Sequence, residues 1–231
     1  MKINSIKDYL KVEFEQSMLD LGFRYVKKDF AFKKTMNKFK CEIYFLTNTW
    51  VYEVDLIPYV GITHPLITSI CNQCNYFVSN VSNLNLFVLE QICLRNGIIA
   101  KGESIRYDLQ LKQADRFELS DWNRIESIQP RLKSLLNLAI SFIDEHACFQ
   151  GLNKLYNNNP YEEYNQFCLS KHMHFFMGII LAKLCEEDYD YYKRIYERRV
   201  REEIDAIEIK DSFKRLLTLL DGINPSDFII Q

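Results

Sequence analysis

The chain has few of the residues that make tight turns, and it lacks the common sequence signatures of catalytic sites. Its 231 residues include only seven glycines and five prolines, which predicts long regular elements with few tight loops. The glycines stand singly, so none belongs to a glycine-rich loop that brings backbone amides to a phosphate. The motifs of serine hydrolases and of helix-borne zinc proteases are missing as well. We therefore predict no catalytic residue, no cofactor and no metal ligand from motifs.

A charge excess of one sign and a long apolar run are also lacking. The 29 basic and 31 acidic residues give a net charge of −2, whereas a dedicated nucleic-acid-binding protein usually has a basic balance. No apolar run approaches the roughly 18 residues needed to span a bilayer. The opening stretch MKINSIKDYLKVEFEQ has no apolar core, so we expect no secretory signal. Seven cysteines without disulfide-type spacing indicate reduced thiols and a cytoplasmic protein.

Hydrophobic periodicity predicts a helix followed by a sheet. Apolar residues recur every three or four positions from Ile3 to Leu21, and Gly22 suits the left-handed position that ends a helix. From Phe23 the period changes to two, and the turn-prone sequences KKD, MNK and TNT separate the runs. This pattern predicts an antiparallel meander of about four strands that packs on the first helix. The inward-facing residues of one strand are Phe39, Cys41, Ile43 and Phe45.

The rest of the chain is mainly helical in pattern. Helical spacing returns in HPLITSICNQCNYFVSNV, and we expect a further helix over 85–96, a returning strand over 105–111, and helices throughout after Ser120. The predicted class is α+β: an N-terminal helix packed on an antiparallel meander of about four strands, followed by a helical C-terminal half. We place an α+β domain at 1–156 and a helical subdomain at 157–231.

A lysine-rich stretch from Gly22 to Lys40, GFRYVKKDFAFKKTMNKFK, is the least ordinary part of the sequence. Adjacent lysines on a strand point to opposite faces, which favours a hairpin with charged tips and edges over one continuous basic face. The local positive charge would still attract an acidic protein or RNA. A nucleic-acid interface would also need the interleaved aromatic rings to be exposed for stacking. The candidate partner-binding residues are Lys27, Lys28, Lys33, Lys34, Lys38 and Lys40.

Two cysteines and two histidines have spacings that raise the question of a metal site. A structural zinc site normally needs a second ligand pair beside Cys71 and Cys74, and both cysteines fall on an apolar helical stripe. Buried thiols are the favoured interpretation, with a metal site and a redox pair as alternatives. His172 and His174 are two apart on a predicted helix and point away from each other, so we interpret them as partly buried, hydrogen-bonded histidines.

Acidic and mixed-charge motifs are interpreted as solvent-facing. Glu53 and Asp55 would share one face of a strand and could bind a cation, but such spacing is common on solvated sheet faces. Asp144, Glu145 and His146 spread around the end of a predicted helix, so we expect them to face solvent rather than to form a site. In DYDYYKRIYERRVREE, charges four apart, such as Arg199 with Glu203, predict a solvated helix face. The other pairs at this spacing are Asp190 with Arg194, Glu197 with Arg201, and Arg198 with Glu202.

The order of these features resembles a group of uncharacterised bacterial domains, including those of DUF4304 type, with a helix–antiparallel sheet–helix plan. The similarity lies in LGFRYVKKDFAFKK (21–34), in the segment EIYFLTNTWVYEVDLIPYVGI and in AISFIDEHACFQGLNKLY (139–156). Some domains of this group are encoded near polymorphic toxin systems, in which small acidic proteins act as immunity partners. The resemblance therefore implies protein binding without catalysis, and it supplies no site residues.

The sequence leaves three functional hypotheses. The first is a non-enzymatic, cytoplasmic bacterial protein that binds another protein, as an immunity or regulatory factor. The second is a nucleic-acid-associated protein that uses the basic hairpin 22–40. The third is an enzyme of unrecognised type.

Overall fold

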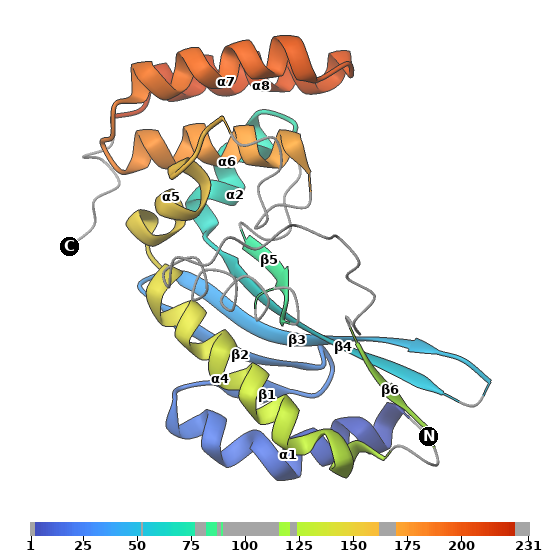
Figure 1. The fold of residues 1–231 in the computed structure, drawn as a ribbon. Coiled ribbons are helices and arrows are strands. Elements are labelled where there is room, and N and C mark those ends of the chain that lie inside the picture. The colour runs from blue at the N-terminus through green and yellow to red at the C-terminus, as the bar shows by residue number, and fades with distance from the viewer. Residues whose placement is uncertain are drawn as a thin grey trace, which may run out of the picture. The chain divides into compact units, whose positions relative to one another are not determined.

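The predicted α+β class is confirmed in a computed structural model of the chain (Figure 1). The structure describes residues 3–51, 53–76, 82–86, 89, 116–120, 124–161 and 170–224. Its elements are, in chain order, α1 (Ile3–Asp20), β1 (Arg24–Val26), β2 (Ala31–Met36), β3 (Phe39–Thr49), β4 (Val54–Thr63), α2 (Pro65–Gln73), β5 (Ser82–Asn85), β6 (Phe117–Leu119), the 3-10 helix η1 (Ile125–Ile128), α4 (Gln129–His146), α5 (Phe149–Asn157), α6 (Lys171–Leu184), α7 (Tyr189–Glu203) and α8 (Ile207–Asp221).

The strands form one sheet in the order β1-β2-β3-β4-β5, and β6 also pairs with β4. Tyr25 of β1 lies opposite Phe32 of β2 in antiparallel register. The predicted meander is confirmed as β1 to β4, and β5 and β6 are strands that the periodicity did not indicate. Asn85 belongs to β5, so the predicted helix does not begin there. The rest of that helix lies mostly outside the described residues, as does the whole predicted strand at 105–111.

Two turns of the meander differ in how well the sequence predicted them. Asn37 and Lys38 both have positive φ angles, 47° and 70°, which is the conformation of a two-residue hairpin turn between β2 and β3. The turn expected at TNT was wrong, because β3 continues to Thr49. The chain turns after it, where the Trp50 amide donates to the Glu53 carbonyl at 2.8 Å.

The contacts divide the chain into two units. The sheet unit comprises residues 1–34, 41–61 and 84–144, and the helical unit comprises 35–40, 62–83 and 145–231. The domain boundary expected near residue 156 stays a prediction. In the described ranges, no helix is both long enough and apolar enough to cross a membrane.

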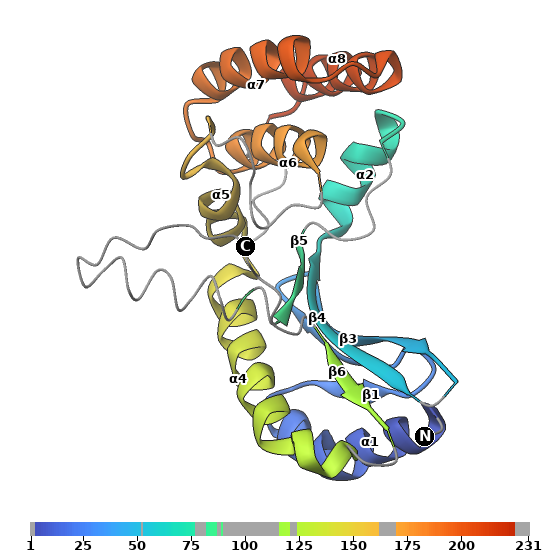
Figure 2. The same cartoon turned by 45° about the vertical axis from the view of Figure 1, so that its right-hand side comes forward.

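In the sheet unit, α1 and α4 lie on the same side of the strands (Figure 2). Gln129 of α4 donates a hydrogen bond to Glu13 of α1, and the Tyr25 hydroxyl donates to the Lys7 carbonyl at 3.1 Å. The predicted inward residues of β3 are all buried. So are the apolar stripes of the two helices, Ile6, Leu10, Phe14 and Met18 in α1 and Leu132, Leu135, Leu136, Ala139, Phe142 and Ile143 in α4. Gly22, with a φ of 83°, ends α1 as expected.

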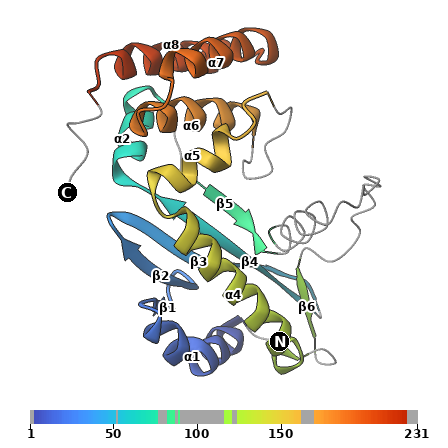
Figure 3. The same cartoon turned by 60° about the vertical axis from the view of Figure 1, so that its left-hand side comes forward.

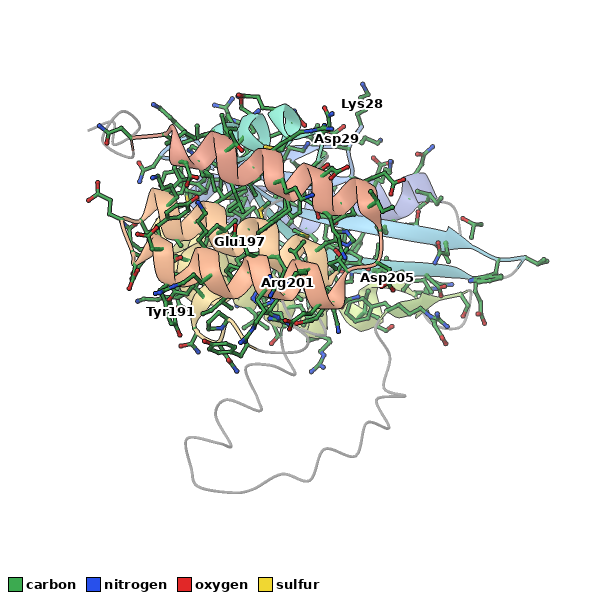
Figure 4. The ribbon with its side chains drawn as sticks, turned by 90° about the horizontal axis from the view of Figure 1, so that it is seen from above. Lys28, Asp29, Tyr191, Glu197, Arg201 and Asp205 are labelled. Carbon is green, nitrogen blue, oxygen red and sulfur yellow. The ribbon has the colours of Figure 1, made fainter. Side chains whose placement is uncertain are left out.

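In the helical unit, α6 packs against α5, α7 and α8, and α2 lies beside α8 (Figure 3). Nearly every residue of α6 is buried. The Phe176 ring stacks on Tyr76 at 3.9 Å and meets Phe213 edge-on at 5.2 Å. Helices α7 and α8 lie side by side, with exposed Glu197 and Arg201 on α7 (Figure 4).

Candidate protein-binding surface

Two of the six candidate lysines have carboxylate partners on the helices of the sheet unit. Lys27 Nζ lies 2.5 Å from Asp8 Oδ1 on α1. Lys34 Nζ lies 3.8 Å from Asp144 Oδ1 on α4 and 5.3 Å from the centre of the Phe23 ring. These pairs join residues far apart in sequence, so the positive charge of both lysines is largely neutralised inside the unit.

Lys33 is also neutralised. Its Nζ lies 2.6 Å from Asp29 Oδ2 and 3.5 Å from Glu42 Oε2. The hydrogen bond from Lys33 lowers the pKa of Asp29, and the same bond raises the pKa of Lys33. Both side chains are partly exposed, so this pair contributes little to folding stability. Its main consequence is that Lys33 offers less charge to a partner.

The other three lysines, Lys28, Lys38 and Lys40, are exposed. None of them forms an ion pair with a carboxylate in the part of the chain that the structure describes. Lys28 projects from the turn between β1 and β2 (Figure 4) and belongs to the sheet unit. Lys38 and Lys40 belong to the helical unit. The free positive charge of the hairpin is therefore carried by three of its six candidate lysines.

The aromatic rings of the hairpin do not form a stacking platform. Four of them are buried in the core, and Tyr25 is half-buried with its hydroxyl bonded to α1. The buried rings are Phe23, Phe30, Phe32 and Phe39. Bases would need exposed rings for stacking, so this stretch offers charge without the aromatic surface of a single-strand-binding site.

Lys40 lies at the edge of a surface groove of about 550 Å³ beside α2. The groove belongs entirely to the helical unit. Helix α2 buries Ile67, Ile70 and Cys71 on one side and turns its polar residues toward the groove. The lining residues are Lys40, Thr63, Pro65, Thr68, Ser69, Asn72 and Gln73.

His64 fixes the beginning of α2 next to this groove. Its Nδ1 accepts from the Leu66 amide at 3.3 Å, and its ring packs against Phe39 at 4.5 Å and Phe149 at 4.8 Å. Burial, followed by the charge of Lys38, lowers the pKa of His64. The lowered pKa favours the neutral ring, whose Nδ1 can accept the capping hydrogen bond. The charge of Lys38 therefore favours the form of His64 that caps α2.

Cys71 and Cys74 are buried, as expected for core thiols. Burial raises the pKa of Cys71 to about 12 and also raises that of Cys74. Reactive thiols need the opposite shift, so burial disfavours the nucleophilic thiolate form of both sulfurs. Across the described ranges, no three His, Cys, Asp or Glu residues come together as a group that could hold a metal ion.

The two histidines of α6 have separate surroundings. His174 is only 2% exposed, and its Nε2 lies 2.8 Å from the Tyr156 carbonyl. A carbonyl only accepts, so Nε2 carries the proton. Burial lowers the pKa of His174 to about 4, and burial also lowers the pKa of His172. The predicted hydrogen-bonded, buried state is confirmed for His174, while His172 meets the Tyr76 ring at 5.8 Å.

A buried polar network surrounds His174, and sequence reasoning did not find it. The Tyr196 hydroxyl donates to Asn157 Oδ1 at 2.6 Å. Asn157 Nδ2 in turn donates to the Gly178 carbonyl at 2.8 Å and to Asn153 Oδ1 at 2.6 Å. Three helices are thus joined by hydrogen bonds in the core. Asn153 and Asn157 are four apart on one helix, but the Gly178 and Tyr196 partners are 21 and 39 residues away, so no sequence spacing would have indicated them.

Arg199 extends the buried polar contacts and corrects the expectation of a solvated charge. Its side chain is 5% exposed and donates to both Glu203 carboxylate oxygens, at 2.6 and 3.1 Å. It also donates to the Pro160 carbonyl at 2.7 Å and lies over the Phe175 ring. The pair with Glu203 exists as predicted. Arg199 nevertheless lies on the buried side of α7, because the Pro160 carbonyl accepts its hydrogen bond and the Phe175 ring packs against its guanidinium.

Glu53 and Asp55 do not form a paired acidic face. Glu53 lies in the turn before β4 and is exposed, whereas Asp55 is only 1% exposed. Asp55 Oδ2 accepts from the Trp50 indole N–H at 2.9 Å, and Oδ1 lies 3.4 Å from Arg116 Nε. The expectation of a solvated face was wrong for Asp55, because β6 adds beside β4 and brings Arg116 over the carboxylate.

In the acidic segment at the end of α4, Asp144 and Glu145 are solvent-facing as expected, whereas the His146 side chain is only 12% exposed, so that expectation was wrong for His146. The side chains of Asp144 and Glu145 are 54% and 74% exposed. His146 lies 4.0 Å from Glu145. The segment therefore supplies one partner for Lys34.

Comparison of the chain with family models, with curated proteins and with solved structures found no match in any of the three. The resemblance to DUF4304-type domains stays a prediction.

Proposed function

We propose that the protein is a non-enzymatic binding module whose partner is an acidic protein. The observation that carries the proposal is the division of the lysines: three are neutralised within the fold, and Lys28, Lys38 and Lys40 remain exposed without a carboxylate partner among the described residues. Exposed charges of one sign steer a complementary partner and set the specificity of an encounter. A role as an immunity or regulatory factor rests on the resemblance to bacterial helix–sheet–helix domains.

Binding to nucleic acid through residues 22–40 is less well supported. The same lysines could contact phosphates, but the aromatic rings beside them are buried. Nucleic-acid binding through charge alone would lose affinity steeply with salt. This alternative is one outcome of the experiment below.

The test is a native mass spectrum of the tagged full-length chain, purified at low salt from its own host. We compare the wild type with Lys28→Glu/Lys38→Glu/Lys40→Glu. The control is Lys133→Glu/Lys154→Glu/Lys214→Glu, which makes the same change of net charge at exposed helical positions.

The expected result is a stoichiometric adduct of net negative charge on the wild type and the control that is lost from the first variant. An adduct that survives the first variant contradicts the proposal. So does a nuclease-sensitive adduct, which would favour the nucleic-acid alternative, and so does a wild-type chain without any adduct.

A further inference from the structure

The groove beside α2 has the chemistry of a site for an extended polypeptide. Four of its residues, Thr68, Ser69, Asn72 and Gln73, follow the spacing of one helical face, and Lys40 stands at the edge. Hydroxyl and amide side chains both donate and accept hydrogen bonds, so they can bind the N–H and C=O groups of a main chain. Among the described residues that line the groove, none carries a carboxylate or a large apolar side chain.

The charge around the groove selects an acidic occupant. Lys40 forms no ion pair with a described carboxylate, and Lys38 lies two residues earlier in the same unit. The charge of Lys38 reaches the capping residue of α2, since it helps to lower the pKa of His64. An apolar or basic segment would leave these charges unpaired, whereas a segment with carboxylates would neutralise them.

We infer that this groove binds an extended acidic segment of the partner protein, an inference that rests on the proposed function. Carboxylates of the segment pair with Lys40 and Lys38. Ser69, Asn72 and Gln73 bind its main chain. Side chains alternate along an extended segment, so acidic residues at every second position present their carboxylates on one side.

The groove can be tested directly with a labelled peptide. The probe is a fluorescein-labelled peptide of alternating glutamate and serine, and the ligand control has glutamine in place of glutamate. Anisotropy is measured with the full-length chain at low salt. Lys40→Gln is compared with Lys214→Gln, which makes the same charge change in the same unit at a second surface groove on α8.

The glutamate peptide should bind, and the glutamine peptide should bind far more weakly. Lys40→Gln should weaken binding roughly fivefold, about 1 kcal/mol for a partly exposed ion pair, while Lys214→Gln leaves it unchanged. Ser69→Trp fills the groove without changing its charge and should weaken binding roughly tenfold or more. Thermal unfolding of each variant confirms that its fold is kept.

Several outcomes would overturn the inference: no binding of the glutamate peptide, equal binding of both peptides, or equal loss in Lys40→Gln and Lys214→Gln. The inference can also fail alone. If the native adduct is lost on reversing the three lysines but Ser69→Trp keeps both adduct and peptide binding, the partner binds outside the groove. If the peptide binds as expected and no protein adduct forms, the proposed function fails.

Discussion

Of the charged and polar side chains that the structure describes, the sheet unit buries a single carboxylate, Asp55, whereas the helical unit buries a set that joins three helices. Asp55 holds two side chains that remain in contact with water: Trp50 is 62% exposed, and the side chain of Arg116 is 42% exposed. In the helical unit, His174 and Arg199 have partners that are themselves largely buried or belong to the main chain.

This difference separates polar contacts that stabilise the fold from polar contacts that orient exposed side chains. A buried group whose partners cannot reach water has no replacement when one partner is removed, so its loss is costly. Asp55 instead fixes the direction of an exposed indole at the end of the β3–β4 hairpin. We therefore expect substitutions in the helical unit to change stability more than the corresponding substitution in the sheet unit.

The largest effect is expected for Arg199→Ala. The change leaves the Pro160 carbonyl without its donor and leaves the Glu203 carboxylate with the Lys171 contact at 3.6 Å. Breaking a largely buried ion pair from one side costs about 3 kcal/mol. Urea unfolding measures the change. The matched control is Arg198→Ala, since Arg198 is exposed and lies 6.0 Å from the Tyr161 ring, a contact that contributes less than about 1 kcal/mol. Equal stability of the two variants would show that Arg199 is not a structural anchor.

A somewhat smaller loss is expected for Gly178→Ala. A Cβ at this position would lie 2.3 Å from the Tyr196 hydroxyl oxygen, so the buried ring must move and its bond to Asn157 must lengthen. Overpacking of this kind costs about 2 kcal/mol. Gly222→Ala is the control, because its Cβ would meet nothing closer than 3.5 Å. The network is less tightly packed than described if both alanine variants unfold at the same urea concentration.

Asp55→Ala tests the sheet unit, where we expect a smaller loss of stability. The indole N–H and the Arg116 guanidinium lose their acceptor, but both can turn toward water, so the expected loss is about 1.5 kcal/mol. In a Trp122→Phe background, Trp50 should become more mobile and more easily quenched by acrylamide. Glu53→Ala, at an exposed turn position, should change neither stability nor quenching. Unchanged quenching in Asp55→Ala would mean that the carboxylate does not fix the indole.

The smallest effect is a pH dependence that belongs to the helical unit, which contains all four histidines of the chain. The pKa of His174 is about 4 in the folded chain against an ordinary 6.5, so the unfolded chain binds the proton more readily. This stabilisation is present above pH 6.5 and is lost as the pH falls toward 4. It amounts to about 1 kcal/mol between pH 8 and pH 6.

His174→Gln should reduce the slope of unfolding free energy against pH over this window without abolishing it. His64 and His172 contribute in the same direction, because burial lowers their pKa values too. Urea unfolding at several pH values gives the slope. A slope equal to that of the wild type would mean that His174 is not buried in its neutral form.

The candidate surface could be predicted only in part. Sequence singled out all six lysines but could not sort them, because the partners of Lys27 and Lys34 come from α1 and α4. The groove was not predictable at all, since the segments bearing Lys40 and Ser69 are distant in the chain. The burial of a polar residue depends on which donors or acceptors from other segments pack against it. Hydrophobic periodicity contains no information about those segments.

Sequence patterns alone were enough to predict the α+β class, the inward faces of α1, β3 and α4, and the end of α1 at Gly22. These features follow from spacing along one element and from the conformational freedom of glycine, which are local properties. The burial of Asp55 and Arg199 depends on the tertiary structure, and so does the finding that Lys38 and Lys40 have no carboxylate partner among the described residues. Burying a charge is tolerated only where donors or acceptors from other segments meet it, and folding alone brings those segments together.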